Sequence, residues 1–98
     1  MQTAVQIHPE QTVTELTLAP GLLHIGTAED NDLVLNEPGI SAYHVKIVTY
    51  FHQSVVFDLS SEGGTFLNGE RVIKHTVKNG DVLQLGDAFL KIRIRPEI

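Results

Sequence analysis

The 98-residue sequence contains no cysteine. Disulfide bonds and cysteine-ligated metal sites are therefore excluded, and the absence agrees with a reducing compartment. No apolar run approaches the roughly 18 residues that a membrane-spanning helix needs. The N-terminal residues lack the basic start and apolar stretch of a secretory signal. We therefore expect a cytoplasmic protein, or the cytoplasmic part of a larger one, with no direct insertion into the membrane.

Basic residues are almost missing from the first 70 positions. That part of the chain has nine acidic residues and a single basic one, Lys46, whereas the rest has six basic and three acidic residues. The formal net charge is −5. A net acidic domain binds nucleic acid poorly unless its few cations gather on one face. We therefore expect no nucleic-acid partner.

What the chain does contain is a series of short runs rich in Val, Ile, Leu and Thr, separated by turn signals. Several runs alternate, so that Leu90, Ile92 and Ile94 are expected to face one way and Lys91, Arg93 and Arg95 the other. The same pattern places Tyr43, Val45 and Ile47 on one face. No segment shows a convincing helical period. Many short strands with turns every 8 to 12 residues or so predict an all-β sandwich or barrel, and the length suits a single domain over residues 1–98.

Two Asn-Gly pairs are the strongest hairpin signals. Asn68-Gly69 and Asn79-Gly80 each lie between alternating runs. Asn and Gly tolerate the positive φ angles of tight turns, so we expect turn chemistry at both places.

Four segments then follow one another in a characteristic order: IGTAEDNDLVL (25–35), PGISAYHVKI (38–47), VFDLSSEGGTFLNGERV (56–72) and VKNGDVLQLGDAFL (77–90). Their order and spacing resemble the forkhead-associated (FHA) domain family. The resemblance implies an all-β sandwich of the SMAD/FHA type, with about 11 short antiparallel or mixed strands. It also implies termini that lie close together and binding loops at one end. A stand-alone domain of this size favours a bacterial source.

The resemblance further implies an interaction module that binds phosphothreonine in an extended peptide. An Arg after the first Gly and the Ser of the second motif would hold the phosphate, while Gly26 and His44 would tie the loops together. The expected peptide- and phosphate-binding loops contain Thr27, Ser41, Ala42, Glu62, Gly63, Gly64, Thr65 and Asn68.

This chain departs from the family pattern at the positions that would contact the ligand. Thr27 and Ala42 stand where Arg is usual, Glu62 replaces a polar or basic residue, and Gly63 replaces an Asn that grips the peptide backbone. A hydrogen bond to a charged group is worth roughly 1.5 to 3 kcal/mol, and a carboxylate near a phosphate repels it by about 1 to 4 kcal/mol per charge pair. We therefore expect an FHA-type module that recognises a protein or peptide without strict need for phosphothreonine.

Two alternatives remain open. The first is a genuine phosphothreonine reader in signalling, in which Arg71, Lys74 or Lys78 supplies the missing positive charge. The second is a structural or self-associating domain of a larger assembly. Lys91, Arg93 and Arg95 form a further candidate surface, or else an ordinary polar strand face that protects an edge from aggregation.

An enzyme is not expected. The five histidines (His8, His24, His44, His52 and His75) have no metal-clip spacing. Ser41 and His44 lie three residues apart, but nothing resembles a nucleophile elbow. Glu29, Asp30 and Asp32 do not match the calcium-loop pattern. We expect no cofactor and no metal.

Overall fold

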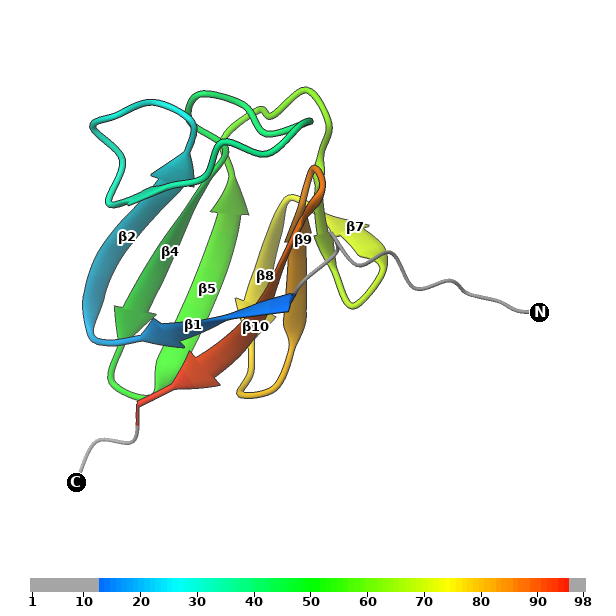
Figure 1. Ribbon diagram of the computed structural model, residues 1–98. Coiled ribbons are helices and arrows are strands. Elements are labelled where there is room, and N and C mark those ends of the chain that lie inside the picture. Colours follow the sequence, from blue (N-terminus) through cyan, green and yellow to red (C-terminus); the bar gives the residue numbers. More distant parts are fainter. Residues whose placement is uncertain (1–12, 96–98) are drawn as a thin grey trace.

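A computed structural model of the chain describes residues 13–95, which form two five-stranded sheets packed face to face (Figure 1). The first sheet has the order β1 (Val13–Leu18), β10 (Ala88–Ile94), β9 (Val82–Leu85), β6 (Thr65–Leu67) and β7 (Glu70–Val72). The second has the order β3 (Leu33–Val34), β2 (Gly21–Gly26), β4 (Val45–Tyr50), β5 (Gln53–Asp58) and β8 (Lys74–Val77).

The predicted all-β sandwich is confirmed, with ten strands among the described residues against the expected number of about 11. β1 pairs with β10 and β2 pairs with β3 in parallel, and the other pairs are antiparallel. The mixed pairing was also expected. Residues 1–12 and 96–98 lie outside the described part, as do His8 and the predicted closeness of the two termini.

The core lies between the sheets and follows the alternation of the sequence. Leu90 and Ile92 are buried, whereas Lys91 and Arg93 on the other face of β10 remain partly exposed. The buried apolar residues come from both sheets: Leu18, Ile25, Val45, Ile47, Val56, Leu67, Val77, Leu83, Leu85, Leu90 and Ile92. Burial of such side chains, at roughly 25 cal/mol per Å², is the main force that holds the sheets together.

The alternation predicted for Tyr43 is wrong. β4 begins at Val45, so Tyr43 lies in the preceding turn and is exposed. Its hydroxyl donates a hydrogen bond to Asp30 at 2.8 Å. The alternation rule fails here because it holds only where the backbone is extended.

Both Asn-Gly pairs form turns, but with different backbones. Asn68 and Gly69 both have positive φ, at 51° and 89°, as a two-residue hairpin requires. At the second pair only Gly80 has a positive φ, of 94°. The connection from β8 to β9 is therefore a different type of turn.

Strand register brings three loops to one end of the sandwich. Ile25 pairs with Val45, and Val45 pairs with Asp58, so that β2 ends, β4 begins and β5 ends at the same level. The first, second and third of these loops cover residues 27–32, 35–44 and 59–64, respectively. They lie together at the top of Figure 1, and we call this end of the sandwich the loop end. The β4–β5 and β8–β9 turns lie at the opposite end.

Candidate functional site

Backbone hydrogen bonds hold the first two loops side by side. The N–H of Thr27 donates to the carbonyl of Ser41, and that of Ala28 donates to the carbonyl of Ala42, both at 3.1 Å. Gly26 lies where the loops come closest. A Cβ atom placed on Gly26 would lie 2.1 Å from the Ala42 oxygen, a distance at which backbone must move. Only glycine fits this contact.

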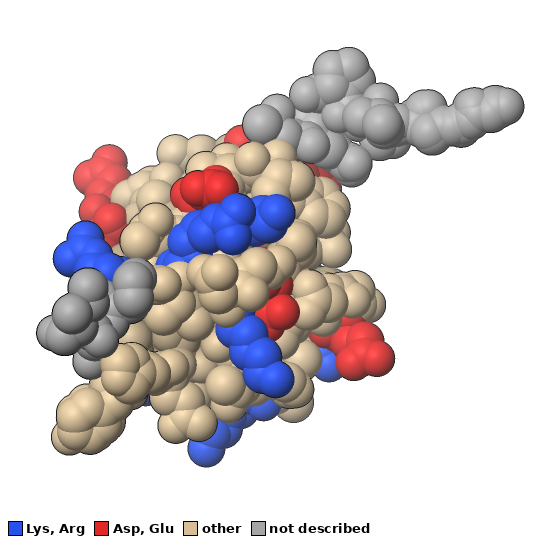
Figure 2. Space-filling view, turned by 90° about the horizontal axis from the view of Figure 1, so that it is seen from below, with Lys and Arg blue, Asp and Glu red and all other residues tan. Residues whose placement is uncertain are grey.

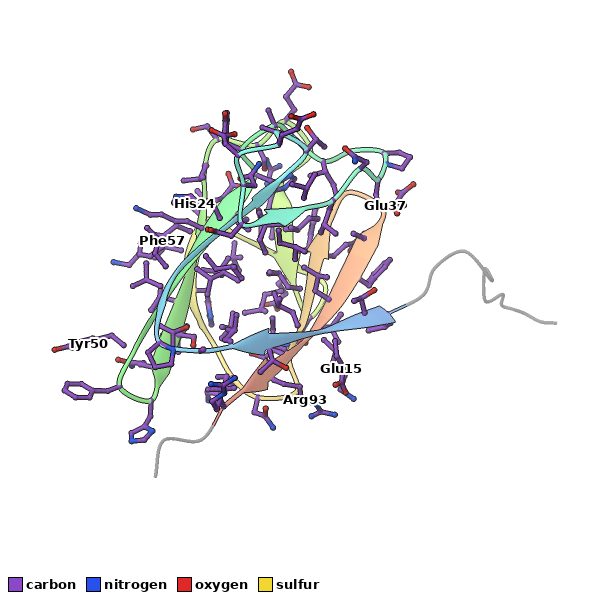
Figure 3. The ribbon with its side chains drawn as sticks, turned by 60° about the vertical axis from the view of Figure 1, so that its left-hand side comes forward. Glu15, His24, Glu37, Tyr50, Phe57 and Arg93 are labelled. Carbon is purple, nitrogen blue, oxygen red and sulfur yellow. The ribbon has the colours of Figure 1, made fainter. Side chains whose placement is uncertain are left out.

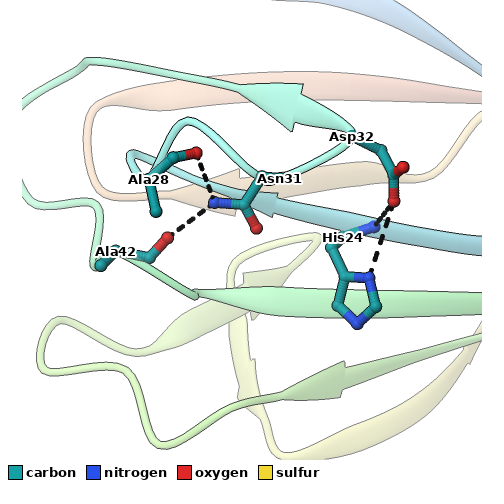
Figure 4. Close-up of polar contacts among 5 residues, drawn as sticks. All are labelled: His24, Ala28, Asn31, Asp32 and Ala42. Carbon is teal, nitrogen blue, oxygen red and sulfur yellow. Dashed lines mark hydrogen bonds and ion pairs between the residues drawn. The ribbon is translucent and has the colours of Figure 1, made fainter.

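Asn31 strengthens the same contact from inside the first loop. Its Nδ2 donates to the carbonyl of Ala28 at 2.9 Å and to that of Ala42 at 2.8 Å (Figure 4). The residue is only 7% exposed, and its Oδ1 has no hydrogen-bond partner within residues 13–95. Asn31 therefore fixes the position of Ala42 from within the fold.

His44 joins the second loop to the third. Its side chain is fully buried, its Nδ1 lies 3.1 Å from the backbone N of Ser41, and its Nε2 lies 2.9 Å from the oxygen of Gly64. Because the Ser41 N–H must donate to Nδ1, the proton sits on Nε2 and is donated to Gly64. The imidazole therefore holds both loops in one tautomer.

Asp58 organises the third loop, at the end of β5. Its carboxylate accepts hydrogen bonds from the Thr65 hydroxyl at 2.6 Å and from the hydroxyl and backbone N–H of Ser61. The Ser61 oxygen in turn accepts the N–H of Gly64 at 3.0 Å. Burial alone raises the pKa of Asp58, but the hydrogen bonds from Ser61 and Thr65 outweigh it and hold the pKa below its ordinary value.

Between the second and third loops lies a hollow of about 380 Å³ lined by Gly39, Ile40, Ser41, Glu62 and Gly63. Glu62 is the only charged residue among the described residues of this lining. The hydroxyl oxygen of Ser41 accepts the backbone N–H of Glu62 at 3.1 Å, so this hydroxyl already joins the two loops. Among the described residues, the lining thus offers a carboxylate, a hydroxyl and backbone groups, and no cation.

Sequence reasoning named Ser41, Glu62 and Gly63 but missed Gly39 and Ile40. The missed signal is the Pro38-Gly39 turn, which only Ile40 separates from Ser41, because a turn next to a binding loop shapes its rim. Gly39 also packs against the β9–β10 turn, since a Cβ on it would lie 2.9 Å from the Cα of Gly86.

Other predicted site residues lie around the hollow or away from it. Thr27 and Ala42 belong to the joined loops but not to the lining, and Gly64 and Thr65 lie beneath it in the hydrogen-bond network. Asn68 is at the far end of β6. There its amide oxygen accepts the N–H of Val82 at 2.9 Å.

The three candidate cations have different positions. Arg71 packs on the third loop, because a Cβ atom on Gly64 would lie 2.8 Å from the Arg71 Nε. Lys74 instead lies over the ring of Phe57, 5.5 Å from its centroid. Lys78 follows β8 and is at the opposite end of the sandwich. Of these cations, Arg71 is the one whose side chain contacts the loop end.

The acidic side chains of the first loop have partners of their own. Asp32 accepts the backbone N–H of His24 at 2.8 Å and lies 3.6 Å from its Nδ1 (Figure 4). The hydrogen bond and the charge of Asp30 raise the pKa of Tyr43. Within residues 13–95, no group of three or more His, Asp or Glu side chains is placed to hold a metal ion.

The candidate surface on β10 includes a cation that already has an acidic partner on the neighbouring strand. Arg93 pairs with Glu15 of β1 at 3.1 Å, and Figure 3 labels both. Seen from the end opposite the loops, Lys and Arg side chains form separate patches with acidic side chains near them (Figure 2). Across the described part of the chain, no helix is long and apolar enough to span a membrane.

Comparison with known proteins identifies the class of this fold. The family model described as FHA domain matches residues 23–86, more than half of the chain, and the chain belongs to this family. FHA domains are protein-interaction modules. The resemblance drawn from the four motifs is thereby confirmed.

Particular relatives agree with this assignment. The ABC transporter ATP-binding/permease protein Rv1747 of Mycobacterium tuberculosis is 39% identical over 73 residues, which cover 74% of this chain and 8% of that protein. The chain is thus similar to a small part of a much longer relative.

Two solved FHA structures are also similar to the chain. One, from an analysis of phosphothreonine-dependent FHA domain interactions, has a TM-score of 0.77 and 30% identity, and covers 82% of this chain and 83% of that one. The other is the FhaA FHA domain complexed with the intracellular domain of Rv3910. It has a TM-score of 0.68 and 31% identity, and covers 71% of this chain and 77% of that one.

Proposed function

We propose that this FHA domain binds a protein partner through its loop end without requiring a phosphate group on that partner. The observation that carries the proposal is the hollow between Ser41 and Gly63, where Glu62 is the only charged side chain that the described part of the chain contributes. A phosphate dianion placed there meets a carboxylate and no lining cation. Such a site is electrostatically matched to neutral or basic segments.

The hydrogen bonds of Ser41 support the same conclusion. Its backbone N–H is donated to His44 and its hydroxyl oxygen accepts the N–H of Glu62. The hydroxyl proton remains available to a ligand, but one neutral donor is much weaker than an Arg–phosphate fork. Loss of one charge-assisted contact weakens binding about 10- to 100-fold.

The frame of the site nevertheless remains suited to an extended peptide. His44 and Asp58 hold the loops in a fixed arrangement through side-chain hydrogen bonds, so a partner meets a preformed surface. Preformed loops avoid the entropy cost of ordering on binding. A domain of this kind recruits a partner and performs no chemistry, so we infer that it is not an enzyme.

A second candidate function is phosphothreonine binding through Arg71. The contact between Arg71 and Gly64 favours it, because this contact places a long cationic side chain on the third loop, beside Gly63 of the hollow. The similar FHA domain studied for phosphothreonine-dependent interactions makes this the natural competitor.

An amide NMR titration distinguishes the two functions. A degenerate phosphothreonine peptide pool and its unphosphorylated twin are added separately to labelled protein, and the amides of Ser41, Glu62 and Thr65 are followed. We expect both pools to shift these amides equally. A response to the phosphorylated pool alone contradicts the proposal. A response to neither pool contradicts peptide binding at this end and favours a structural or self-associating role.

Arg71→Ala identifies the cation in the competing case. It should abolish a phosphate-specific response, whereas Lys78→Ala removes the same charge from the opposite end and should leave that response unchanged. Sedimentation over a range of protein concentrations measures self-association independently. The assignment of residues 1–98 to one domain and the cytoplasmic location remain predictions.

A further inference from the structure

The outer face of the second sheet has an unusual composition. The chain has twelve Asp and Glu residues, yet none of the outward-facing side chains on β2, β4, β5 and β8 is acidic. The acidic residue nearest in the pairing scheme, Asp32 beside β3, is paired with His24. This face is therefore positive in a protein whose net charge is negative.

Strand register places two lysines on either side of one aromatic ring. Lys46 of β4 pairs with Phe57 of β5, and Phe57 pairs with Lys74 of β8. The Nζ atoms of Lys46 and Lys74 lie 5.2 and 5.5 Å from the centroid of the Phe57 ring. Within residues 13–95, neither ammonium group has a carboxylate at ion-pair distance. The ring thus orders two cations that lack an anionic partner in this part of the chain.

The next row of the same face is apolar on the three central strands of the sheet and ends at Thr76 of β8. Leu22 pairs with Val48, and Val48 pairs with Val55. Leu22 is 54% exposed, and Tyr50 at the end of β4 is 69% exposed. The water-facing side of an antiparallel sheet is commonly polar, so a row of this kind next to two cations indicates a contact surface. Figure 3 shows Phe57 and Tyr50 pointing away from the sandwich on the same side.

We propose that this outer face is a second docking surface, distinct from the loop end, and that it binds an acidic segment of a protein partner. Carboxylates of the partner would contact Lys46 and Lys74, and its apolar side chains would cover Leu22, Val48 and Val55. The charge of the face selects this occupant, because the loops at the neighbouring end carry five of the protein's twelve acidic residues and repel an acidic segment. Two cations held over one ring discriminate against a basic or neutral segment.

The direct test uses a synthetic unphosphorylated peptide that alternates Glu and Leu, and a twin in which Gln replaces every Glu. Both are titrated into labelled protein. We expect the Glu peptide to shift the amides of Lys46, Val55 and Phe57 and the Gln peptide to bind about tenfold more weakly or not at all. The amides of Ser41 and Glu62 should stay unshifted, which separates this surface from the loop end.

Matched variants locate the binding. Lys46→Gln combined with Lys74→Gln should weaken binding of the Glu peptide at least about tenfold, because both charged contacts are lost. Lys78→Gln combined with Lys91→Gln changes the net charge equally but leaves the face intact, and should alter binding less than about twofold. Equal weakening by both pairs overturns the proposal, since it indicates only long-range attraction.

Three other outcomes also overturn it. Shifts confined to Ser41 and Glu62 assign the peptide to the loop end. Absence of any shift rules out an acidic peptide as the occupant. Binding to phosphatidylglycerol vesicles that depends on Lys46 and Lys74, without binding of the peptide, assigns the face to an anionic lipid surface.

Discussion

The Nε2 of His44 lies 2.9 Å from the carbonyl oxygen of Gly64, twenty residues further along the chain. The same imidazole accepts the N–H of Ser41 through Nδ1. One buried ring thus holds together two loops that lie apart in the sequence. It explains how the loop end keeps its shape.

Replacing His44 with Ala should destabilise the domain by about 2 to 4 kcal/mol. The variant leaves the Ser41 N–H and the Gly64 carbonyl without partners, and each buried unsatisfied group costs about 1 to 3 kcal/mol. Chemical denaturation measures the loss. His52→Ala, which removes an exposed imidazole from the β4–β5 turn, should change the stability by less than about 0.5 kcal/mol. A similar small effect for His44→Ala contradicts the assigned role.

Asp58→Asn should destabilise the domain by about 1 to 3 kcal/mol near neutral pH, because an ionised acceptor of Ser61 and Thr65 hydrogen bonds is replaced by a neutral one. The folded-state pKa of Asp58 is lowered. Its contribution is therefore fully present above the unfolded pKa of about 3.9 and is lost as the pH falls through the folded value.

The free energy of unfolding of both proteins, measured from neutral to strongly acidic pH, tests this prediction. The difference between the wild type and Asp58→Asn should shrink below the unfolded pKa. Glu29→Gln removes an exposed carboxylate and should follow the wild type throughout. A difference that stays constant with pH shows that the ionisation of Asp58 does not contribute.

Gly26→Ala should cost about 1 to 3 kcal/mol or more, because the new methyl group meets the backbone of Ala42 at 2.1 Å and two joined loops must separate. Gly63→Ala is the matched comparison, since its nearest contact is the Gly39 oxygen at 3.1 Å and a shift of a few tenths of an ångström relieves it. Thermal unfolding compares the two variants. Equal losses indicate that the loop contact at Gly26 is not special.

Much of the fold could be predicted from the sequence because its signals are local. Alternation in β10 and the Asn68-Gly69 turn each depend on a few neighbouring residues, and the structure follows them. Tyr43 departs from the pattern because a turn interrupts the strand just before Val45. A local rule does not reveal where an extended backbone ends.

The candidate site was predictable only in part, because contacts between distant segments decide it. The hydroxyl of Ser41 accepts the N–H of Glu62, 21 residues away, and Lys74 lies over Phe57 rather than at the loops. Neither relationship follows from spacing. Both arise from strand register, which the sequence limits but does not specify residue by residue.

Restoring the family pattern should create phosphothreonine binding. Thr27→Arg adds a cation, Glu62→Thr removes a repulsive carboxylate, and Gly63→Asn returns an amide that can grip the peptide backbone. Each charge-assisted bond contributes about 1.5 to 3 kcal/mol, so the triple variant should prefer a phosphothreonine peptide over its unphosphorylated twin by about 100-fold or more. Fluorescence anisotropy with both labelled peptides measures this preference.

The control adds Ser41→Ala to the triple variant and should lose part of the gained preference, since the Ser41 hydroxyl proton is a native side-chain donor at the hollow. Gly63→Asn brings a Cβ atom to 3.1 Å from the Gly39 oxygen, so the fold must accommodate this contact. The unfolding midpoint of each variant is therefore measured alongside. If the unaltered protein already shows the full preference, the replaced residues do not account for phosphate recognition, and Arg71, which packs on Gly64, becomes the residue to test. If the folded triple variant shows no preference, the three replaced side chains are not sufficient for phosphate recognition, and the shape of the hollow suits a different ligand.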